Sequence, residues 1–284
     1  GSIIMALGLI LSSSDFTTGS LADPPWNSAN NSGAHFLGGV TGSSQFNSVL
    51  TSPLTNAGGF SRNFKQNGVN RPYGFWNVSN SVDSGIYTGP YSTSKAYSLR
   101  AWIRKEDNAG DNRDSGIGLF ARNIFDGTTL SIINSAEVYS AIPGGYTLQL
   151  SNRAAVGQVA TSGRSSLWLQ IRSPTLPNSV GITSIQCSGS TNNEYVLDTW
   201  HRVRMDVIPV GSSGDTINVY TSSAGDVTSG NEIWELVESQ WVDSSDGYYV
   251  DPTNSNLQMG FYSFGQPGGE NCYIDQFEIL VQDI

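Results

Sequence analysis

The chain has 284 residues, of which 14 are Lys or Arg and 24 are Asp or Glu, so charged side chains make up only 13%. That share is about half the usual one in soluble proteins. Its 32 glycines and 11 prolines are typical of many short strands joined by turns, and they exclude long amphipathic helices. A net charge of −10 with only three lysines argues against nucleic acid as a partner.

The charge is unevenly distributed along the sequence. Residues 1–193 hold 12 basic and 9 acidic side chains, whereas residues 194–284 hold 2 basic and 15 acidic ones. The carboxylates of this last third are dispersed and form no run, which favours a solvated outer face that keeps the protein soluble. Cation binding and docking to a basic partner are the alternatives.

Residues 1–57 show little periodicity and are rich in Gly, Ser and Asn, so we expect an irregular N-terminal arm before a sandwich of residues 58–284. The apolar stretch 3–10 is far shorter than the roughly 20 residues that span a bilayer. We therefore expect an edge strand or an assembly arm there, without membrane insertion.

From residue 58 onwards, short runs of alternating apolar and polar residues recur, which predicts strands. About ten such strands, separated by turn-rich spacers, favour a two-sheet sandwich or a closed barrel. The stretch 233–241 is ambiguous, because its apolar residues also fit one face of a short helix. The predicted strands are 73–78, 97–104, 117–122, 146–150, 167–172, 182–187, 200–207, 217–220, 257–262 and 273–281.

Alternation also assigns side chains to faces. Successive side chains of a strand point to opposite sides, so the apolar residues of the runs 97–104 and 167–172 face the core. Each run then places a tryptophan beside arginine on its outward face. These two outward rows are Arg100, Trp102 and Arg104, and Trp168, Gln170 and Arg172.

Residues 198–207, with the sequence DTWHRVRMDV, resemble the strand motif D-x-W-H-x-V-x-V of laminin G-like domains, within the concanavalin A-like lectin/glucanase superfamily. Residues 215–220 are similar to the next strand of that family, and residues 257–264 and 271–279 to its closing strands. The resemblance covers the chain from about residue 97 to the end. It implies an all-β fold, a two-sheet antiparallel jelly-roll sandwich.

Cys187 and Cys272 are too few for a disulfide scaffold or a zinc site. They form one disulfide or remain two buried thiols. Laminin G-type domains place the partner cysteine after the Trp-His strand, whereas Cys187 precedes it, so the resemblance does not carry the family's disulfide over.

The superfamily includes enzymes, but catalytic patterns are poorly matched. Retaining glucanases of the fold carry both carboxylates on one face of a strand, whereas the spacing of three between Asp275 and Glu278 predicts opposite faces. Polysaccharide lyases of the fold need a histidine beside tyrosine and arginine. His201 shares its face with Val203, which predicts a histidine at the margin of the core. We therefore expect a non-catalytic protein.

Two binding hypotheses remain. Indole rings stack on the C–H faces of sugars while guanidinium and amide groups bind hydroxyls and carboxylates, so the two outward rows, placed side by side, predict a glycan site. A ladder of cross-strand contacts is the alternative. In the loop 106–114, the carboxylates of Asp107, Asp111 and Asp114 are suitable oxygen ligands for Ca²⁺, although their spacing departs from the EF-hand pattern.

The Ser, Thr, Asn and Gly-rich composition and the scarcity of lysine resemble bacteriophage and viral virion proteins that combine an irregular arm with a lectin-like sandwich. This resemblance implies a structural or adhesive component of the virion surface, such as a capsid decoration, appendage or tail-fibre module. Its partners would be surface glycans and other virion proteins or further copies of itself, with a trimer plausible. The alternative is an extracellular carbohydrate-active enzyme, a glycoside hydrolase or polysaccharide lyase, or its binding module.

Overall fold

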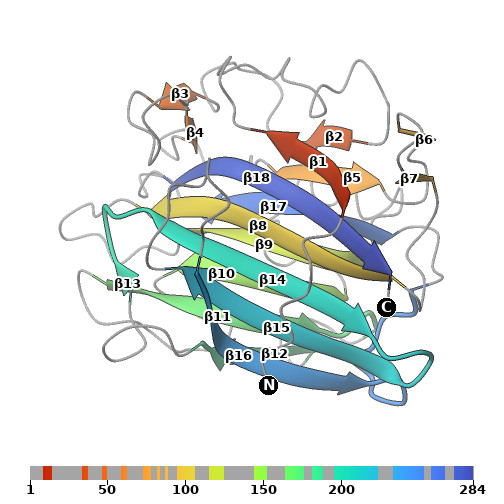
Figure 1. Ribbon diagram of the computed structural model, residues 1–284. Coiled ribbons are helices and arrows are strands. Elements are labelled where there is room, and N and C mark those ends of the chain that lie inside the picture. Colours follow the sequence, from red (N-terminus) through yellow and green to blue (C-terminus); the bar gives the residue numbers. More distant parts are fainter. Residues whose placement is uncertain are drawn as a thin grey trace.

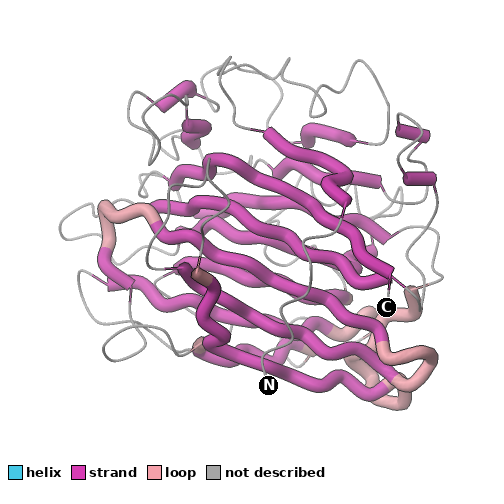
Figure 2. The backbone as a smooth tube through the Cα atoms, viewed as in Figure 1, coloured by secondary structure: helices cyan, strands magenta, loops and turns pink. Residues whose placement is uncertain are grey.

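The computed structural model describes eighteen strands and some of the turns beside them, and the described part of the chain contains no helix (Figure 2). All strand pairs are antiparallel. The described residues are 9–14, 34–37, 47–49, 59–62, 73–77, 82–83, 87–88, 95–105, 115–124, 144–151, 164–175, 181–187, 195–222, 233–252, 257–265 and 272–283.

Sheet A forms the front layer in Figure 1 and runs in the order β16-β15-β14-β8-β18-β4-β3, with β1 pairing beside β4 on the same edge of β18. Its strands are β1 (Leu9–Ser14), β3 (Asn47–Val49), β4 (Gly59–Arg62), β8 (Lys95–Lys105), β14 (His201–Pro209), β15 (Gly214–Ser222), β16 (Trp234–Asp243) and β18 (Cys272–Asp283).

Sheet B lies behind it and runs in the order β12-β11-β10-β9-β17-β5-β2, with β13 paired to β11. Its strands are β2 (Ala34–Leu37), β5 (Tyr73–Asn77), β9 (Ser115–Ile124), β10 (Gly145–Ser151), β11 (Arg164–Arg172), β12 (Ile182–Gln186), β13 (Tyr195–Val196) and β17 (Leu257–Gly265). The short strands β6 (Val82–Asp83) and β7 (Tyr87–Thr88) pair only with each other among the described strands.

The chain passes between the sheets at β4 and β5, at β8 and β9, and at β17 and β18. This exchange of neighbouring strands between two facing antiparallel sheets gives the jelly-roll sandwich that the sequence predicted. All ten predicted strands are present.

The core fills the space between the inner faces of the two sheets, and the face assignments for β8 and β11 are confirmed. One contiguous buried cluster joins both sheets, because each strand alternates between core and outer side chains. It includes Tyr97, Leu99, Ala101, Ile103, Val203, Met205, Val207, Ile217 and Val219 from sheet A, and Ile117, Leu119, Tyr146, Leu148, Leu150, Leu167, Leu169 and Ile171 from sheet B.

Two findings refine the sequence interpretation. The ambiguous stretch 233–241 is a strand, β16, and not a helix. The lead-in is not wholly irregular, since β1, β2 and β3 within residues 1–57 pair with the two sheets. The domain boundary after residue 57 stays a prediction. Among the described residues, no helix has the length and apolar character required to cross a bilayer.

Candidate functional site: the outer face of sheet A

The two outward rows of the sequence analysis lie on different sheets. β8 carries Arg100, Trp102 and Arg104 in sheet A, whereas β11 carries Trp168 and its neighbours in sheet B. Both rows point away from the shared core, so they lie on opposite outer sides of the sandwich. The expectation that they stand side by side is therefore wrong: alternation along a strand separates inside from outside but does not reveal which sheet the strand joins.

The row on sheet B is buried and internally bonded. Trp168, Gln170 and Arg172 have exposed fractions of 2%, 0% and 1%. Arg172 donates to Gln170 Oε1 at 2.7 Å, and Gln170 Nε2 donates to Ser184 Oγ at 3.3 Å. The Trp168 indole N–H donates to the Ser151 carbonyl at 3.3 Å. This row is a cross-strand polar ladder, the alternative that the sequence left open, and it offers no open surface to a sugar.

The row on sheet A belongs to a wider set of outward side chains, which we call the arginine–aromatic face. The strand register places Trp102 opposite Arg202, Arg100 opposite Arg204, and Arg204 opposite Tyr220, because directly paired residues project on the same side. The face comprises Arg100, Trp102, Arg202, Arg204, Asp206, Tyr220, Trp234 and Glu278, from β8, β14, β15, β16 and β18.

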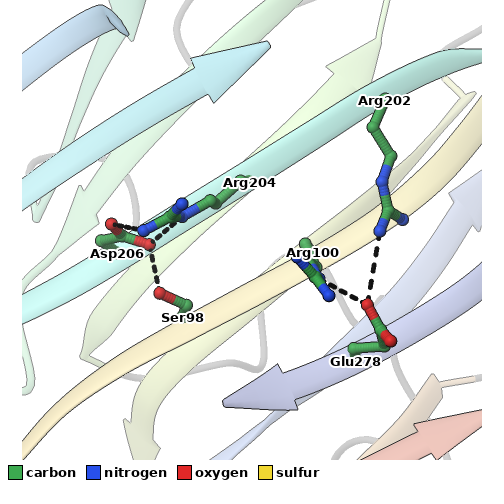
Figure 3. A network of polar contacts seen from close by, with 6 residues as sticks. All are labelled: Ser98, Arg100, Arg202, Arg204, Asp206 and Glu278. Carbon is green, nitrogen blue, oxygen red and sulfur yellow. Dashed lines mark hydrogen bonds and ion pairs between the residues drawn. The ribbon is translucent and has the colours of Figure 1, made fainter. Parts of the chain in front are cut away.

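Two carboxylates fix the arginines of this face (Figure 3). Asp206 accepts both Arg204 Nε at 2.7 Å and Arg204 Nη2 at 2.6 Å, and Ser98 Oγ donates to the same carboxylate. Glu278 Oε2 accepts from Arg100 Nε and, at 3.4 Å, from Arg202 Nη2. Because the Arg204 pair is bidentate, its guanidinium is held in orientation as well as position.

Aromatic rings alternate with these guanidiniums. The Arg202 guanidinium carbon lies 5.9 Å from the Trp102 ring centroid and 5.7 Å from that of Trp234. The Arg204 carbon lies 4.9 Å from the Tyr220 centroid and 5.8 Å from that of Trp234. All four separations are within the range of a cation–π contact. Arg202 and Arg204 are buried, at 1% and 8% exposed, whereas the three rings are partly exposed.

Arg104 lies at the rim of this face. Its Nη2 atom contacts Asp198 Oδ1 at 3.3 Å, and the Asp198 side chain is 51% exposed. Solvent-exposed pairs of this kind contribute little to stability, so the pair sets the position of Arg104 only weakly.

Sequence reasoning missed several members of the face for identifiable reasons. The alternation rule, applied to the run 200–207, would have placed Arg202, Arg204 and Asp206 outward. Trp234 stood in the stretch that also fitted a helix. Glu278 of β18 pairs with Arg100 of β8 and Arg202 of β14. These strands are far apart in sequence order, and no local signal connects them.

The reasoning used to separate Asp275 from Glu278 does not hold. Asp275 pairs with Trp102 and Glu278 with Arg100. The two acids are three residues apart on β18, whereas their partners are two residues apart on β8. A β-bulge therefore interrupts the alternation between the two acids. Glu278 is an ion-pair partner of Arg100 and Arg202.

The histidine of the Trp-His strand faces the interior, as predicted. The His201 ring meets Tyr195 edge to face, with centroids 5.0 Å apart, and is partly buried. It thus lies on the opposite side of β14 from the arginines. For His35, in β2, the structure gives only the backbone.

The calcium hypothesis for Asp107, Asp111 and Asp114 concerns residues outside the described part of the chain. Where residues are described, no three His, Cys, Asp or Glu side chains gather as a metal ion would require. Ca²⁺ therefore stays a prediction for the loop 106–114.

The disulfide option is not realised, because Cys187 is a free and fully buried thiol. Burial raises the pKa of this thiol to about 12, so it stays protonated in neutral solution. Cys187 packs in the main core as a small apolar side chain.

A second charged cluster, unforeseen from sequence, connects the two sheets inside the sandwich. Arg122 Nη2 of β9 lies 2.8 Å from Asp215 Oδ1 of β15, and both side chains are fully buried. The Tyr146 hydroxyl donates to Asp215 Oδ2 at 2.6 Å, and Arg122 Nη1 donates to the Val250 carbonyl at 3.1 Å. Burial raises the pKa of the Asp215 carboxyl, while Arg122 and the Tyr146 hydroxyl act in the opposite direction.

No protein-family model and no curated protein sequence matches this chain. Among solved structures, it is similar to the metal-free carbohydrate recognition domain of Emp46p, with a TM-score of 0.49 and 9% identity over 91% of this chain and 93% of that one. Peanut lectin gives a TM-score of 0.48 and 11% identity over 96% and 98% of the two chains.

The binding domain of botulinum neurotoxin serotype G gives a TM-score of 0.44 and 12% identity over 90% of this chain. This chain spans only 45% of the length of that domain. The sheet order and the shared core of this protein define its fold.

Proposed function

We propose that this protein is a non-catalytic, lectin-like component of a virion surface that holds glycans on its arginine–aromatic face. One observation carries the proposal: the partly exposed rings of Trp102, Trp234 and Tyr220 stand over two buried guanidiniums that carboxylates have fixed in place.

The chemistry of this arrangement suits a sugar. An exposed indole or phenol offers an electron-rich face to the C–H side of a pyranose ring, and the adjacent cation polarises the ring system. Since the arginines are already paired with Asp206 and Glu278, little side-chain entropy is lost when a ligand settles on the rings. A preformed face of this kind favours recognition over turnover.

The non-catalytic part of the proposal is supported by the roles of the polar groups. Asp206 and Glu278 on this face serve as partners of arginine, and His201 points to the core. Glycoside hydrolysis would require two carboxyls on either side of a bound sugar.

The virion setting is supported by composition alone: few lysines, a net charge of −10 and abundant Gly, Ser, Thr and Asn. In this setting the other partners would be further virion proteins or copies of the same chain, and a trimer is expected. Light scattering on the purified full chain tests this part, because a monomer would contradict the expected symmetric assembly.

A glycan array tests the site itself. We expect the intact protein to retain at least one class of glycan and the double variant Trp102→Ala, Trp234→Ala to lose that retention. The matched control is Trp241→Ala, which removes an exposed tryptophan, 48% exposed, from the same β16 strand but outside the arginine–aromatic face. Retention by the double variant, or equal loss in the control, would contradict the proposed site.

Incubating the same glycans with the protein tests the enzymatic alternative. Reducing ends indicate a hydrolase, and unsaturated uronates indicate a lyase. Either product, formed by the intact protein and proportional to its concentration, would overturn the non-catalytic assignment.

A further inference from the structure

The edge of sheet A formed by β16 has unusual surface chemistry. Among the described strands, β16 pairs on one side only, with β15, and Figure 1 shows it at the lower border of the sheet. Three of the four exposed large apolar residues in the described chain lie on β16 or directly before it: Ile233 at 72%, Leu236 at 52% and Trp241 at 48% exposed. An edge strand that no second described strand pairs with, and that exposes apolar side chains, is a template for strand addition.

The charge of this edge selects the kind of partner. Glu235 is exposed and Glu238 is partly exposed on β16. From residue 205 to the end, the sequence has 13 acidic residues and no Lys, Arg or His. A cationic side chain brought to this edge therefore meets carboxylates that have no competing basic residue nearby in the sequence.

The same features disfavour a second copy of the chain as the occupant. Two β16 strands laid edge to edge would bring an acidic strand against an acidic strand, at a cost from like charges. The register also shifts between Val219 and Tyr220 in the pairing with β16, so the edge carries a bulge at Val237. Bulges on edge strands oppose long pairing of identical edges.

One backbone amide of the edge strand already donates a hydrogen bond to a side-chain carboxylate. The Ser239 amide donates to Glu238 Oε1 at 3.0 Å, and Gln240 Nε2 donates to the same oxygen at 2.7 Å. A partner that supplies a cation to Glu238 and a carbonyl to Ser239 can replace these contacts. This exchange requires a partner with both a backbone edge and positive charge.

We propose that the outer edge of β16, which no other described strand pairs with, binds an extended peptide segment in which basic and apolar residues alternate. The segment adds as a further antiparallel strand, its apolar side chains cover Leu236 and Trp241, and its cations meet Glu235 and Glu238. This is β-strand addition with charge selection. This edge adjoins the arginine–aromatic face, since Leu236 pairs with Tyr220, but the inference does not depend on glycan binding.

Calorimetry with synthetic peptides tests the proposal on the full-length chain. The probe is a peptide of alternating lysine and valine, as long as β16. We expect binding that weakens as salt rises, since exposed charges are screened, and slower amide exchange along β16. The same peptide N-methylated at every residue, which lacks backbone donors, and a glutamate–valine peptide should not bind. Absence of binding by the probe, or equal binding by either control peptide, would overturn the proposal.

Substitutions in the protein localise the site. The double variant Glu235→Lys, Leu236→Lys should weaken binding of the lysine–valine peptide by about tenfold or more, whereas Val210→Lys should leave it within about twofold. Val210 is the matched control, since it is 48% exposed but lies in the turn after β14. Equal loss in both variants would place the peptide elsewhere. A dimer seen by light scattering that the double variant dissolves would assign the edge to a second copy and overturn the proposal.

Discussion

Arg122 shows how one backbone angle redirects a side chain. Alternation along β9 predicts an outward side chain after Ala121, but Arg122 has a φ of 58° and lies in a bulge, because β17 pairs Met259 with Ala121 and Gln258 with Asn123. The extra residue turns the guanidinium inward, where it meets Asp215. Bulges commonly re-aim a side chain in this way.

Replacing Arg122 with methionine should destabilise the protein by about 3–5 kcal/mol at neutral pH, because Asp215 loses its buried counter-charge. The loss should shrink as the pH falls toward the ordinary pKa of a carboxyl and should be smallest below it. Burial raises the folded-state pKa of Asp215, so stability linked to its proton is present at low pH and lost as the pH rises. Urea unfolding at both pH values measures this.

Asp198→Asn serves as the control for this prediction. It breaks the exposed pair with Arg104, and asparagine tolerates the left-handed φ of 59° at this position. We expect a change under about 1 kcal/mol. An equal effect of the two substitutions would refute the structural role of the buried cluster.

The Cys187 thiol should resist thiol reagents in the folded protein. In a Cys272→Ser background, we expect no labelling at neutral pH until denaturant unfolds the chain, because the side chain is fully buried and its pKa is about 12. Its linked stability should be complete below the ordinary thiol pKa and decline as the pH rises toward 12. Rapid labelling of folded protein would contradict this placement.

At the scale of elements, the β14–β15 hairpin depends on one of its two glycines more than on the other. Gly214 has a φ of 149°, and a Cβ there would lie 2.2 Å from the Val242 carbonyl oxygen of β16. Gly211 also has a positive φ, 56°, but a Cβ there would meet nothing within 4 Å. A side chain at position 211 therefore introduces backbone strain alone, whereas one at position 214 also overlaps with β16.

Alanine substitutions at three glycines should give a graded series in thermal or urea unfolding. Gly211→Ala should cost about 1–2 kcal/mol from its left-handed conformation alone, and Gly214→Ala should cost more because β15 and β16 must separate. Gly247→Ala should be neutral or slightly stabilising, as its surroundings are open. A Gly214→Ala variant as stable as Gly247→Ala would contradict the hairpin geometry.

The apolar residues of β16 that also fitted a helix do not share one face of the strand. Leu236 points outward and Val237, the extra residue, points into the core. Trp241 then faces outward again. The four apolar residues that fitted one helix face therefore lie on different faces of the strand, which periodicity alone does not reveal.

At the scale of the whole molecule, Trp102 and Trp168 lie on opposite sides of the sandwich. Trp168→Ala should destabilise by about 3–5 kcal/mol, because the indole is 2% exposed. Combined with Trp102→Ala, its effect should be additive within about 0.5 kcal/mol. By contrast, Trp102→Ala and Trp234→Ala should be non-additive, since both rings contact Arg202.

A double-mutant cycle in urea measures both pairs under the same conditions. Coupling between Trp102 and Trp168 of the size found for neighbouring residues would contradict the assignment of β8 and β11 to different sheets. If the destabilisations of Trp102→Ala and Trp234→Ala were strictly additive, this would contradict a contact that both rings share through Arg202.

The sequence by itself determined ten of the eighteen described strands and, where alternation is regular, their inner faces. Period-two runs such as 97–104 and 167–172 have one apolar face, and burial of that face stabilises the strand wherever it pairs. The low charge and the many glycines excluded long amphipathic helices, and the Trp-His motif indicated the jelly-roll sandwich.

Only the tertiary structure decided which faces are shared and which side chains meet. Sheet membership is set by pairing between strands far apart in sequence, so neither the separation of Trp102 from Trp168 nor the meeting of Glu278 with Arg202 has a local signal. Bulges at Arg122 and between Asp275 and Glu278 further break the alternation. A side chain's direction is local in a regular strand, whereas its neighbours depend on the whole fold.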